Sequence, residues 1–189
     1  EGYDIQCDTV IIGAGACGLV AALAAHEQGQ SVLVVERDVI PRGSTALSAG
    51  LIPAAGTKFQ HEAGITDSPE IFAADIQQKA NNENDRAIVD LLAENAGKVI
   101  EWLAETHNLA FSVVTDFDYP GHSNRRMHGL PTRSGAELID ALRTACETTE
   151  IDIICARHAQ HLYFDGHNIT GASVIGPDGQ SETIACQKM

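Results

Sequence analysis

Three glycines, Gly13, Gly15 and Gly18, stand at the spacing Gly-x-Gly-x-x-Gly between an apolar run and a segment of helical character. The first glycine permits a tight turn, the second lets the backbone approach a pyrophosphate, and the third lets a helix pack closely against a strand. A helix beginning at Ala16 would direct free N–H groups and about half a positive charge at two phosphates. The spacing therefore predicts a dinucleotide-binding turn.

The acidic residue Glu36 ends a second apolar run, Ser-Val-Leu-Val-Val-Glu, which covers residues 31–36. A carboxylate at the end of this strand of a dinucleotide-binding unit accepts hydrogen bonds from a ribose diol. Because it would repel a 2′-phosphate, Glu36 disfavours NADP. Together with a strand over 7–12 and a helix over 16–28, the run predicts a βαβ unit.

Further helices are predicted by N-capping residues that precede apolar residues at helical spacing. Ser68 followed by Pro69 predicts a helix to about residue 80. Asn84 predicts a longer helix to about residue 106, and the capping box from Ser134 to Glu137 predicts another. The apolar positions expected to form one face of the longer helix are Ile88, Leu91, Leu92, Val99, Trp102 and Leu103.

Two segments have neither helical nor strand periodicity. Residues 37–57, rich in Gly, Ala, Ser and Pro, predict a loop, and residues 110–133 predict an irregular segment. The second segment holds a cluster that could bind a carboxylate or transfer a proton, namely His122, Arg125, Arg126 and His128. The alternative, which we favour, is that these side chains hold their loop in place, because no partner base can be named.

Strands are predicted from residue 151 onward, over 151–156, 160–164, 169–175 and 181–186. Turns at Asp165-Gly166 and Pro177-Asp178-Gly179 separate the last three, which predicts an antiparallel meander. A βαβ unit, a helical excursion and a meander do not follow the alternating pattern of an NAD-dependent dehydrogenase. The order fits a flavoprotein better.

Composition excludes several classes of protein. The 189 residues carry a net charge of −14, which opposes binding to nucleic acid or to anionic membrane surfaces. No apolar run approaches the ~20 residues of a membrane span, and the N-terminus lacks the features of a signal peptide. The five cysteines show no C-x-x-C or zinc-type spacing. We therefore expect a cytoplasmic protein without a bound metal.

These motifs in combination resemble the fumarate reductase/succinate dehydrogenase flavoprotein family, which includes L-aspartate oxidases and 3-ketosteroid dehydrogenases. The likeness rests on the glycine turn, Glu36-Arg37, the Gly-Ser-Thr-Ala-Leu-Ser-Ala-Gly loop over 43–50, the cluster over 122–128 and the meander. It implies an α/β fold, a Rossmann-like FAD-binding domain with a parallel sheet, a helical excursion and an antiparallel meander. Residues 1–60 would hold the βαβ unit and flavin loop, 61–150 the helical segment and 151–189 the meander.

The resemblance implies FAD as the cofactor. The implied contacts come from the turn, the second strand, the loop after it and the meander: Gly13, Gly15, Ala16, Gly18, Glu36, Arg37, Gly43, Ser44, Thr45, Ser48, Ala49, Gly50 and Ala159. Covalently flavinylated members carry a histidine at the position of Ser44, so non-covalent FAD is implied.

In this family the flavin exchanges a hydride with a carbon next to a carbonyl or carboxyl group, so the implied partners are a small-molecule substrate and an electron donor or acceptor. The family carries its substrate residues mainly in a capping domain and the later part of the chain. We expect this chain, which ends at Met189, to be the N-terminal portion of a longer protein and to lack that domain. A non-catalytic FAD-binding module or truncated paralogue is the alternative, and dicarboxylates, amino acids and steroids all stay open as substrates.

Overall fold

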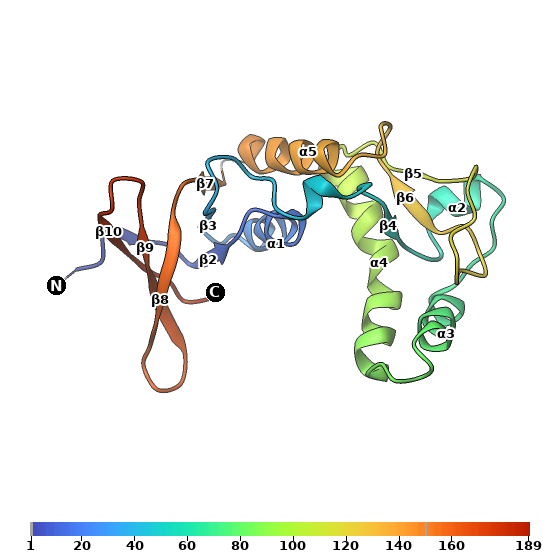
Figure 1. Cartoon of the computed structure of the whole chain (residues 1–189), viewed down its shortest axis with the longest axis horizontal. Coiled ribbons are helices and arrows are strands. Elements are labelled where there is room, and N and C mark those ends of the chain that lie inside the picture. The colour runs from blue at the N-terminus through green and yellow to red at the C-terminus, as the bar shows by residue number, and fades with distance from the viewer. Residues whose placement is uncertain (1, 150) are drawn as a thin grey trace. The chain divides into compact units, whose positions relative to one another are not determined.

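The computed structural model describes residues 2–149 and 151–189 (Figure 1). It contains two compact units, Glu1–Ser48 with Leu138–Met189 and Ala49–Glu137, which we call the first and second units. Among the described residues no helix has the length and apolar character needed to cross a bilayer. The five cysteines are all free thiols.

The first unit contains a parallel sheet with the strand order β2-β3-β7. Strand β2 (Thr9–Ile12) pairs with β3 (Val32–Val35), and helix α1 (Ala16–Glu27) connects them, so the predicted βαβ unit is confirmed. Strand β7 (Asp152–Ile154) pairs in parallel with β3. Its expected place in the meander is therefore wrong. Like β3, it follows a helix, here α5 (Gly135–Thr148), and continues the parallel sheet.

The three remaining predicted strands form the expected antiparallel meander. They are β8 (His158–Phe164), β9 (Ile169–Ile175) and β10 (Ser181–Ala185). Strand β1 (Ile5–Gln6) adds in parallel to β10, which gives the strand order β1-β10-β9-β8. This pairing joins segments near the two ends of the chain and was not predicted from the sequence.

The core of the first unit combines residues from both sheets. Its buried members are Val10, Leu33, Val35, Val174, Ile184 and Cys186. Helix α1 buries Leu19, Ala22 and Leu23. Strands β2 and β3 contribute apolar side chains at successive positions, as strands covered on both faces do. Burial of these side chains therefore fixes the two strands between which the glycine turn and α1 lie.

The second unit combines short strands with helices. A sheet of strand order β4-β6-β5 contains β4 (Ile52–Pro53), β5 (Ser112–Val113) and β6 (Met127–Gly129). The helices are α2 (Lys58–Glu62), α3 (Pro69–Lys79) and α4 (Arg86–Thr106). Strands β5 and β6 lie in the segment expected to be irregular, because strands of two or three residues carry no visible periodicity.

Helix α2 was not predicted, although it has a complete capping box. The Thr57 hydroxyl accepts a hydrogen bond from the Gln60 N–H at 3.1 Å, and the Gln60 side chain accepts one from the Thr57 N–H at 3.3 Å. At the start of α5 the Ser134 hydroxyl accepts a hydrogen bond from the Ala136 N–H at 3.2 Å, so Ser134 caps the helix as predicted, but the reciprocal bond to Glu137 is replaced. Instead, the Glu137 carboxylate accepts hydrogen bonds from the N–H and the hydroxyl of Thr132.

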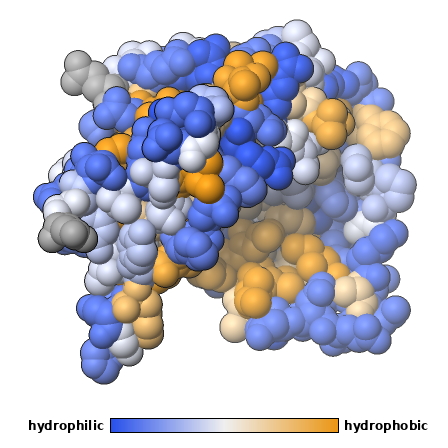
Figure 2. Space-filling model, turned by 60° about the vertical axis from the view of Figure 1, so that its left-hand side comes forward, coloured by the Kyte–Doolittle hydropathy of each residue, from blue (hydrophilic) through white to orange (hydrophobic). Residues whose placement is uncertain are grey.

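Helix α4 differs from its prediction in its cap, and of the predicted apolar face only Leu103 is among its buried residues. Asp85 is the N-cap rather than Asn84, with its carboxylate accepting from the Ala87 N–H at 2.8 Å. The buried positions are Val89, Ala93, Gly97, Ile100 and Leu103. Four of the positions expected to form one apolar face are exposed, namely Ile88, Leu91, Leu92 and Val99. Figure 2 shows that apolar residues lie among hydrophilic ones on the surface of the molecule.

A close backbone contact explains why α4 buries this face. A Cβ atom at Gly97 would lie 2.8 Å from the carbonyl oxygen of Ala55. The helix therefore approaches the backbone at Ala55 through its small residues. Larger side chains on that face would move the helix away from this segment.

Candidate nucleotide-binding site

The local structure constrains the three glycine positions of the predicted turn in different ways. Gly13 has φ of +101°, a conformation that side chains other than glycine rarely adopt. A Cβ atom at Gly18 would lie 1.9 Å from the Gly13 carbonyl oxygen. Gly15 has extended backbone, and a Cβ atom there would meet only the Thr45 Oγ1 atom, at 3.8 Å. The backbone conformation thus requires glycine at 13 and a close contact requires it at 18, whereas a Cβ atom at Gly15 would make only one ordinary contact.

The N-terminus of α1 is suited to bind an anion. Gly15 is its N-cap, no side chain caps it, and its first turn carries no acidic residue in this described part of the chain. One N–H group of the turn, that of Ala16, donates to the Thr45 hydroxyl at 3.2 Å. The dipole of a 12-residue helix is therefore not balanced by an acidic side chain in its first turn, and a helix end of this kind favours an anionic group.

Glu36 is buried, with 8% of its surface exposed, and its carboxylate holds the backbone on both sides of the turn. One oxygen accepts a hydrogen bond from the Ala14 N–H at 2.7 Å, and the other accepts one from the Asp38 N–H at 2.8 Å. A carboxylate has about four acceptor positions, so capacity for a ribose diol remains. These two bonds to the main chain were not foreseen from the sequence.

The loop after β3 returns to the turn. Gly43 has φ of +52°, and a Cβ atom there would lie 4.0 Å from the Gly15 Cα atom. Ser44, which is exposed, precedes the short 3-10 helix η1 (Thr45–Leu47), and the Ser48 hydroxyl donates to the Thr45 carbonyl at 2.7 Å. Small and polar residues of this loop therefore lie beside the anion-binding end of α1.

The other predicted cofactor residues are distributed more widely. Arg37 is exposed beside Asp38, and Ala159 lies in β8, the edge strand of the meander, opposite Val174. Ala49 and Gly50 belong to the second unit. Gly50 has φ of +61°, and a Cβ atom there would lie 2.7 Å from the Ser134 carbonyl oxygen, so its own unit requires glycine.

His128 and Arg125, two of the catalytic candidates, are both engaged by neighbours. His128 is fully buried, and its ring nitrogens lie 2.8 Å from the Thr57 hydroxyl and 2.9 Å from the Arg126 carbonyl oxygen. Burial lowers the pKa of His128. Arg125 forms an exposed ion pair with Asp118 at 2.7 Å. These contacts hold the loop in place, as the alternative interpretation of the cluster expects.

Arg126 has the most buried charge of the cluster. Its guanidinium is fully buried and donates to both carboxylate oxygens of Asp67, at 2.9 and 3.0 Å, and to Asp75 at 2.5 Å. It also lies over the ring of Phe72 at 4.9 Å. Sequence reasoning did not separate Arg126 from its exposed neighbour Arg125, because adjacent arginines look alike without a known backbone path.

Substitution of Gly18 and Gly15 by alanine is expected to affect stability very differently. Gly18→Ala should lower the free energy of unfolding by about 1–3 kcal/mol or more, because its Cβ would overlap the Gly13 carbonyl. Gly15→Ala should change it by less than about 0.5 kcal/mol. Urea unfolding of the nucleotide-free chain measures both, and a larger loss for Gly15→Ala would contradict this division.

Glu36→Gln is expected to destabilise the chain even without nucleotide. The amide can keep only one acceptor oxygen, so the Ala14 or Asp38 N–H loses its partner at a cost of about 1–3 kcal/mol. Urea unfolding of the nucleotide-free protein measures this loss. Unchanged stability would show that Glu36 does not hold the turn.

Relatives of known name match most of this chain but only part of their own length. NADH:fumarate oxidoreductase of Klebsiella pneumoniae is 31% identical over 182 residues, which cover 95% of this chain and 19% of the relative. The probable fumarate reductase Ifc3 of Shewanella frigidimarina is 33% identical and is matched over 88% of this chain and 28% of its own length. The chain thus spans between 19% and 28% of the length of these relatives.

Solved structures and a family model agree with these matches. A flavocytochrome c3 fumarate reductase in its open conformation superposes with a TM-score of 0.88 at 30% identity, over 98% of this chain and 33% of that one. The model of the FAD binding domain family matches residues 8–188 and indicates FAD as the cofactor. The chain belongs to this family, the FAD-dependent flavoproteins of the fumarate reductase/succinate dehydrogenase type.

Proposed function

We propose that this chain is the cofactor-binding part of an oxidoreductase that moves a hydride between the flavin N5 and a carbon adjacent to a carbonyl or carboxyl group. The observation that carries the proposal is the α1 N-terminus, which has no side-chain cap and no acidic residue in its first turn, and which begins at Gly15, where a Cβ atom would meet only Thr45. Bound FAD would supply the hydride chemistry. Relatives named fumarate reductase, urocanate reductase and L-aspartate oxidase support this reaction class.

Each cofactor residue has a proposed task. The backbone N–H groups at the start of α1 bind the pyrophosphate, and Gly15 gives it room. Glu36 accepts from the adenosine ribose diol while keeping the turn closed through Ala14 and Asp38. The remaining proposed FAD contacts are Arg37, Gly43, Ser44, Thr45, Ser48, Ala49, Gly50 and Ala159.

Substrate binding and proton transfer are proposed to come from a capping domain rather than from the 122–128 cluster. Both ring nitrogens of His128 have partners, and Arg126 is bound to two carboxylates. A general acid must reach the proton acceptor, and a buried His128 between two partners is not free to do so. We likewise propose that this domain determines the substrate and the electron partner of the whole protein.

Flavin bound to this protein is expected to be released by acid precipitation, because Ser44 offers no imidazole for a covalent bond. The chain is loaded with FAD, precipitated with acid and centrifuged, and the flavin absorbance of the supernatant and the pellet is compared. Recovery in the supernatant supports non-covalent binding. Flavin that stays with the denatured pellet would contradict it.

The proposed function is tested by titrating the flavin-free chain with FAD and, separately, with NAD. Preferential binding of FAD is expected. The FAD in the loaded chain is then photoreduced with EDTA as the electron donor, and the chain is mixed anaerobically with fumarate and with an enone. Reoxidation of the flavin by these acceptors is expected only in a longer protein that includes the capping domain. Tighter binding of NAD than of FAD would overturn the proposal.

A further inference from the structure

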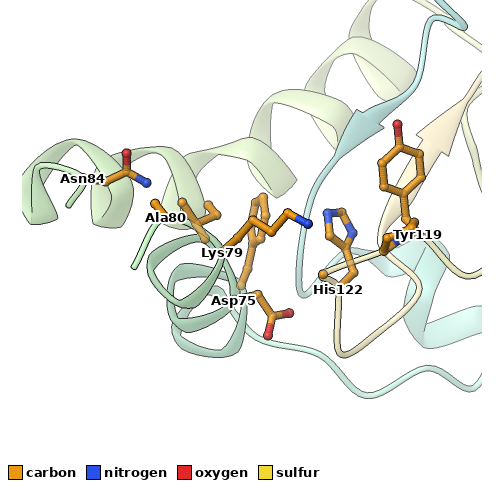
Figure 3. Close-up of a pocket in the computed structure, with 10 residues that line it drawn as sticks. Asp75, Lys79, Ala80, Asn84, Tyr119 and His122 are labelled. Atoms are coloured by element: carbon orange, nitrogen blue, oxygen red, sulfur yellow. The ribbon is translucent and has the colours of Figure 1, made fainter. Parts of the chain in front are cut away.

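The second unit contains a pocket that the nucleotide site does not use. It lies between α3 and the loop over 119–122 and has a volume of about 360 Å³ (Figure 3). Pockets of about 300–1,000 Å³ are typical of small-molecule sites in proteins. All of its lining residues belong to the second unit, so the pocket is complete within that unit.

Flat rings and aliphatic side chains form most of the wall. The Tyr119 and His122 rings lie 5.4 Å apart at an interplanar angle of 38°, and the Phe72 ring lies 6.3 Å from His122. Ile76 and Pro120 complete the apolar surface. Such walls favour a planar, mainly apolar ligand, because ring faces gain contact area and quadrupole interactions with another ring.

Two polar groups of the wall have no partner in the described part of the chain. The Nδ1 atom of His122 is buried and makes no hydrogen bond. The Lys79 side chain is exposed and lies over Gly121, with its Cδ 3.2 Å from the position of a Cβ there, and its ammonium is in none of the ion pairs between described residues. Figure 3 shows this ammonium directed toward the His122 ring. A buried polar atom without a partner costs stability, so a ligand that pairs with it gains affinity.

The neighbouring carboxylate and guanidinium satisfy one another. One oxygen of Asp75 accepts from the Ser123 N–H and hydroxyl, both at 2.8 Å, and from Arg126. Burial opposes ionisation of Asp75, but the bonds from Ser123 and Arg126 outweigh it and lower the pKa of this carboxyl. The Arg126 guanidinium is therefore paired with carboxylates of the protein. Lys79 is the cation of the pocket wall that can pair with an incoming anion.

We propose that this pocket binds a small aromatic carboxylate, with its ring against Tyr119 and its carboxylate between the Lys79 ammonium and the His122 Nδ1–H. This site goes beyond the proposed FAD-dependent function and does not depend on it. Burial and the nearby Arg126 lower the pKa of His122, so its imidazole is neutral at pH 7 and carries one N–H. A bound carboxylate would select the tautomer that carries this proton on Nδ1.

Calorimetric titration of the 189-residue chain with benzoate tests the proposal. Saturable one-to-one binding is expected. Lys79→Gln should weaken it at least about tenfold, the effect of losing one charge-assisted hydrogen bond. Lys98→Gln is the matched control, because Lys98 is an exposed lysine of α4 outside the pocket, and it should leave the affinity unchanged.

His122→Phe keeps the ring and removes the nitrogens, so the chain should stay folded and benzoate affinity should fall about threefold or more. In wild-type protein, the imidazole ¹⁵N shifts of His122 should move on saturation toward those of the Nδ1–H tautomer. Absence of benzoate binding, equal affinity in Lys79→Gln, or tighter binding of benzylamine would each overturn the proposal. FAD titration of the same samples reports separately on the nucleotide site, so the two failures are distinguishable.

Discussion

Gly15→Val is expected to weaken FAD binding at least about a hundredfold while leaving the chain folded. The backbone at Gly15 is extended, which valine adopts readily, and a Cβ there meets only Thr45 at 3.8 Å. The side chain would fill the space assigned to the pyrophosphate. Loss of two charge-assisted hydrogen bonds costs about 3–6 kcal/mol, which is a hundredfold or more in affinity.

The matched control is Gly2→Val, the same change at a glycine with open space and ordinary backbone before β1. Calorimetric titration with FAD and urea unfolding are measured on both variants. Gly2→Val should bind FAD like the wild type. Wild-type FAD affinity in Gly15→Val would contradict the assignment of this turn to the pyrophosphate, whereas unfolding of Gly15→Val would contradict the single ordinary contact of a Cβ atom there.

Arg126→Met is expected to lower the free energy of unfolding by about 3–5 kcal/mol. The guanidinium is fully buried against Asp67, itself buried, and Asp75, so its removal leaves carboxylates without their counter-charge. Methionine retains much of the apolar stem but none of the donors. Urea unfolding of the nucleotide-free chain measures the loss directly.

The adjacent arginine provides the control for this prediction. Arg125→Met removes an exposed ion pair with Asp118, whose carboxylate side chain is 79% exposed, and should cost less than about 1 kcal/mol. Equal losses in the two variants would mean that burial of the Arg126 network does not govern its contribution to stability.

The parts of the fold that could be predicted from the sequence are those determined by local pattern. The turn at Gly13 to Gly18 and the apolar runs beside it predicted the βαβ unit, because each feature restricts the backbone over a few residues. The turns at Asp165 and Pro177 likewise predicted the meander. In each case a short-range signal and the burial of one face agree.

The parts that could not be predicted depend on distant contacts. Pairing of β7 with β3, and of β1 with β10, follows from tertiary packing that no local pattern specifies. Leu91 belongs to the predicted apolar face of α4 but is exposed, because the helix makes its close backbone contact through another face, at Gly97. Helix α2 did have a signal in the sequence, the capping pair of Thr57 and Gln60. This signal was missed because a helix of five residues is too short to show helical periodicity.

The candidate site shows the same division. The sequence predicted Gly15 and Glu36 as nucleotide residues because their spacing along a βαβ unit carries that chemistry. It did not predict that Glu36 also accepts from the Ala14 and Asp38 N–H groups, since the side-chain direction of Glu36 is not specified by its place after a strand. Nor could it identify the pocket at His122, which arises where α3 meets a loop far along the chain.

The central claim is that the α1 N-terminus and Glu36 bind the dinucleotide portion of FAD. Calorimetric titration of the flavin-free chain with FAD and with riboflavin tests it most directly, because riboflavin has the flavin ring but lacks the pyrophosphate and the adenosine ribose. We expect FAD to bind at least about a hundredfold more tightly than riboflavin. Equal affinity for riboflavin and FAD would contradict it.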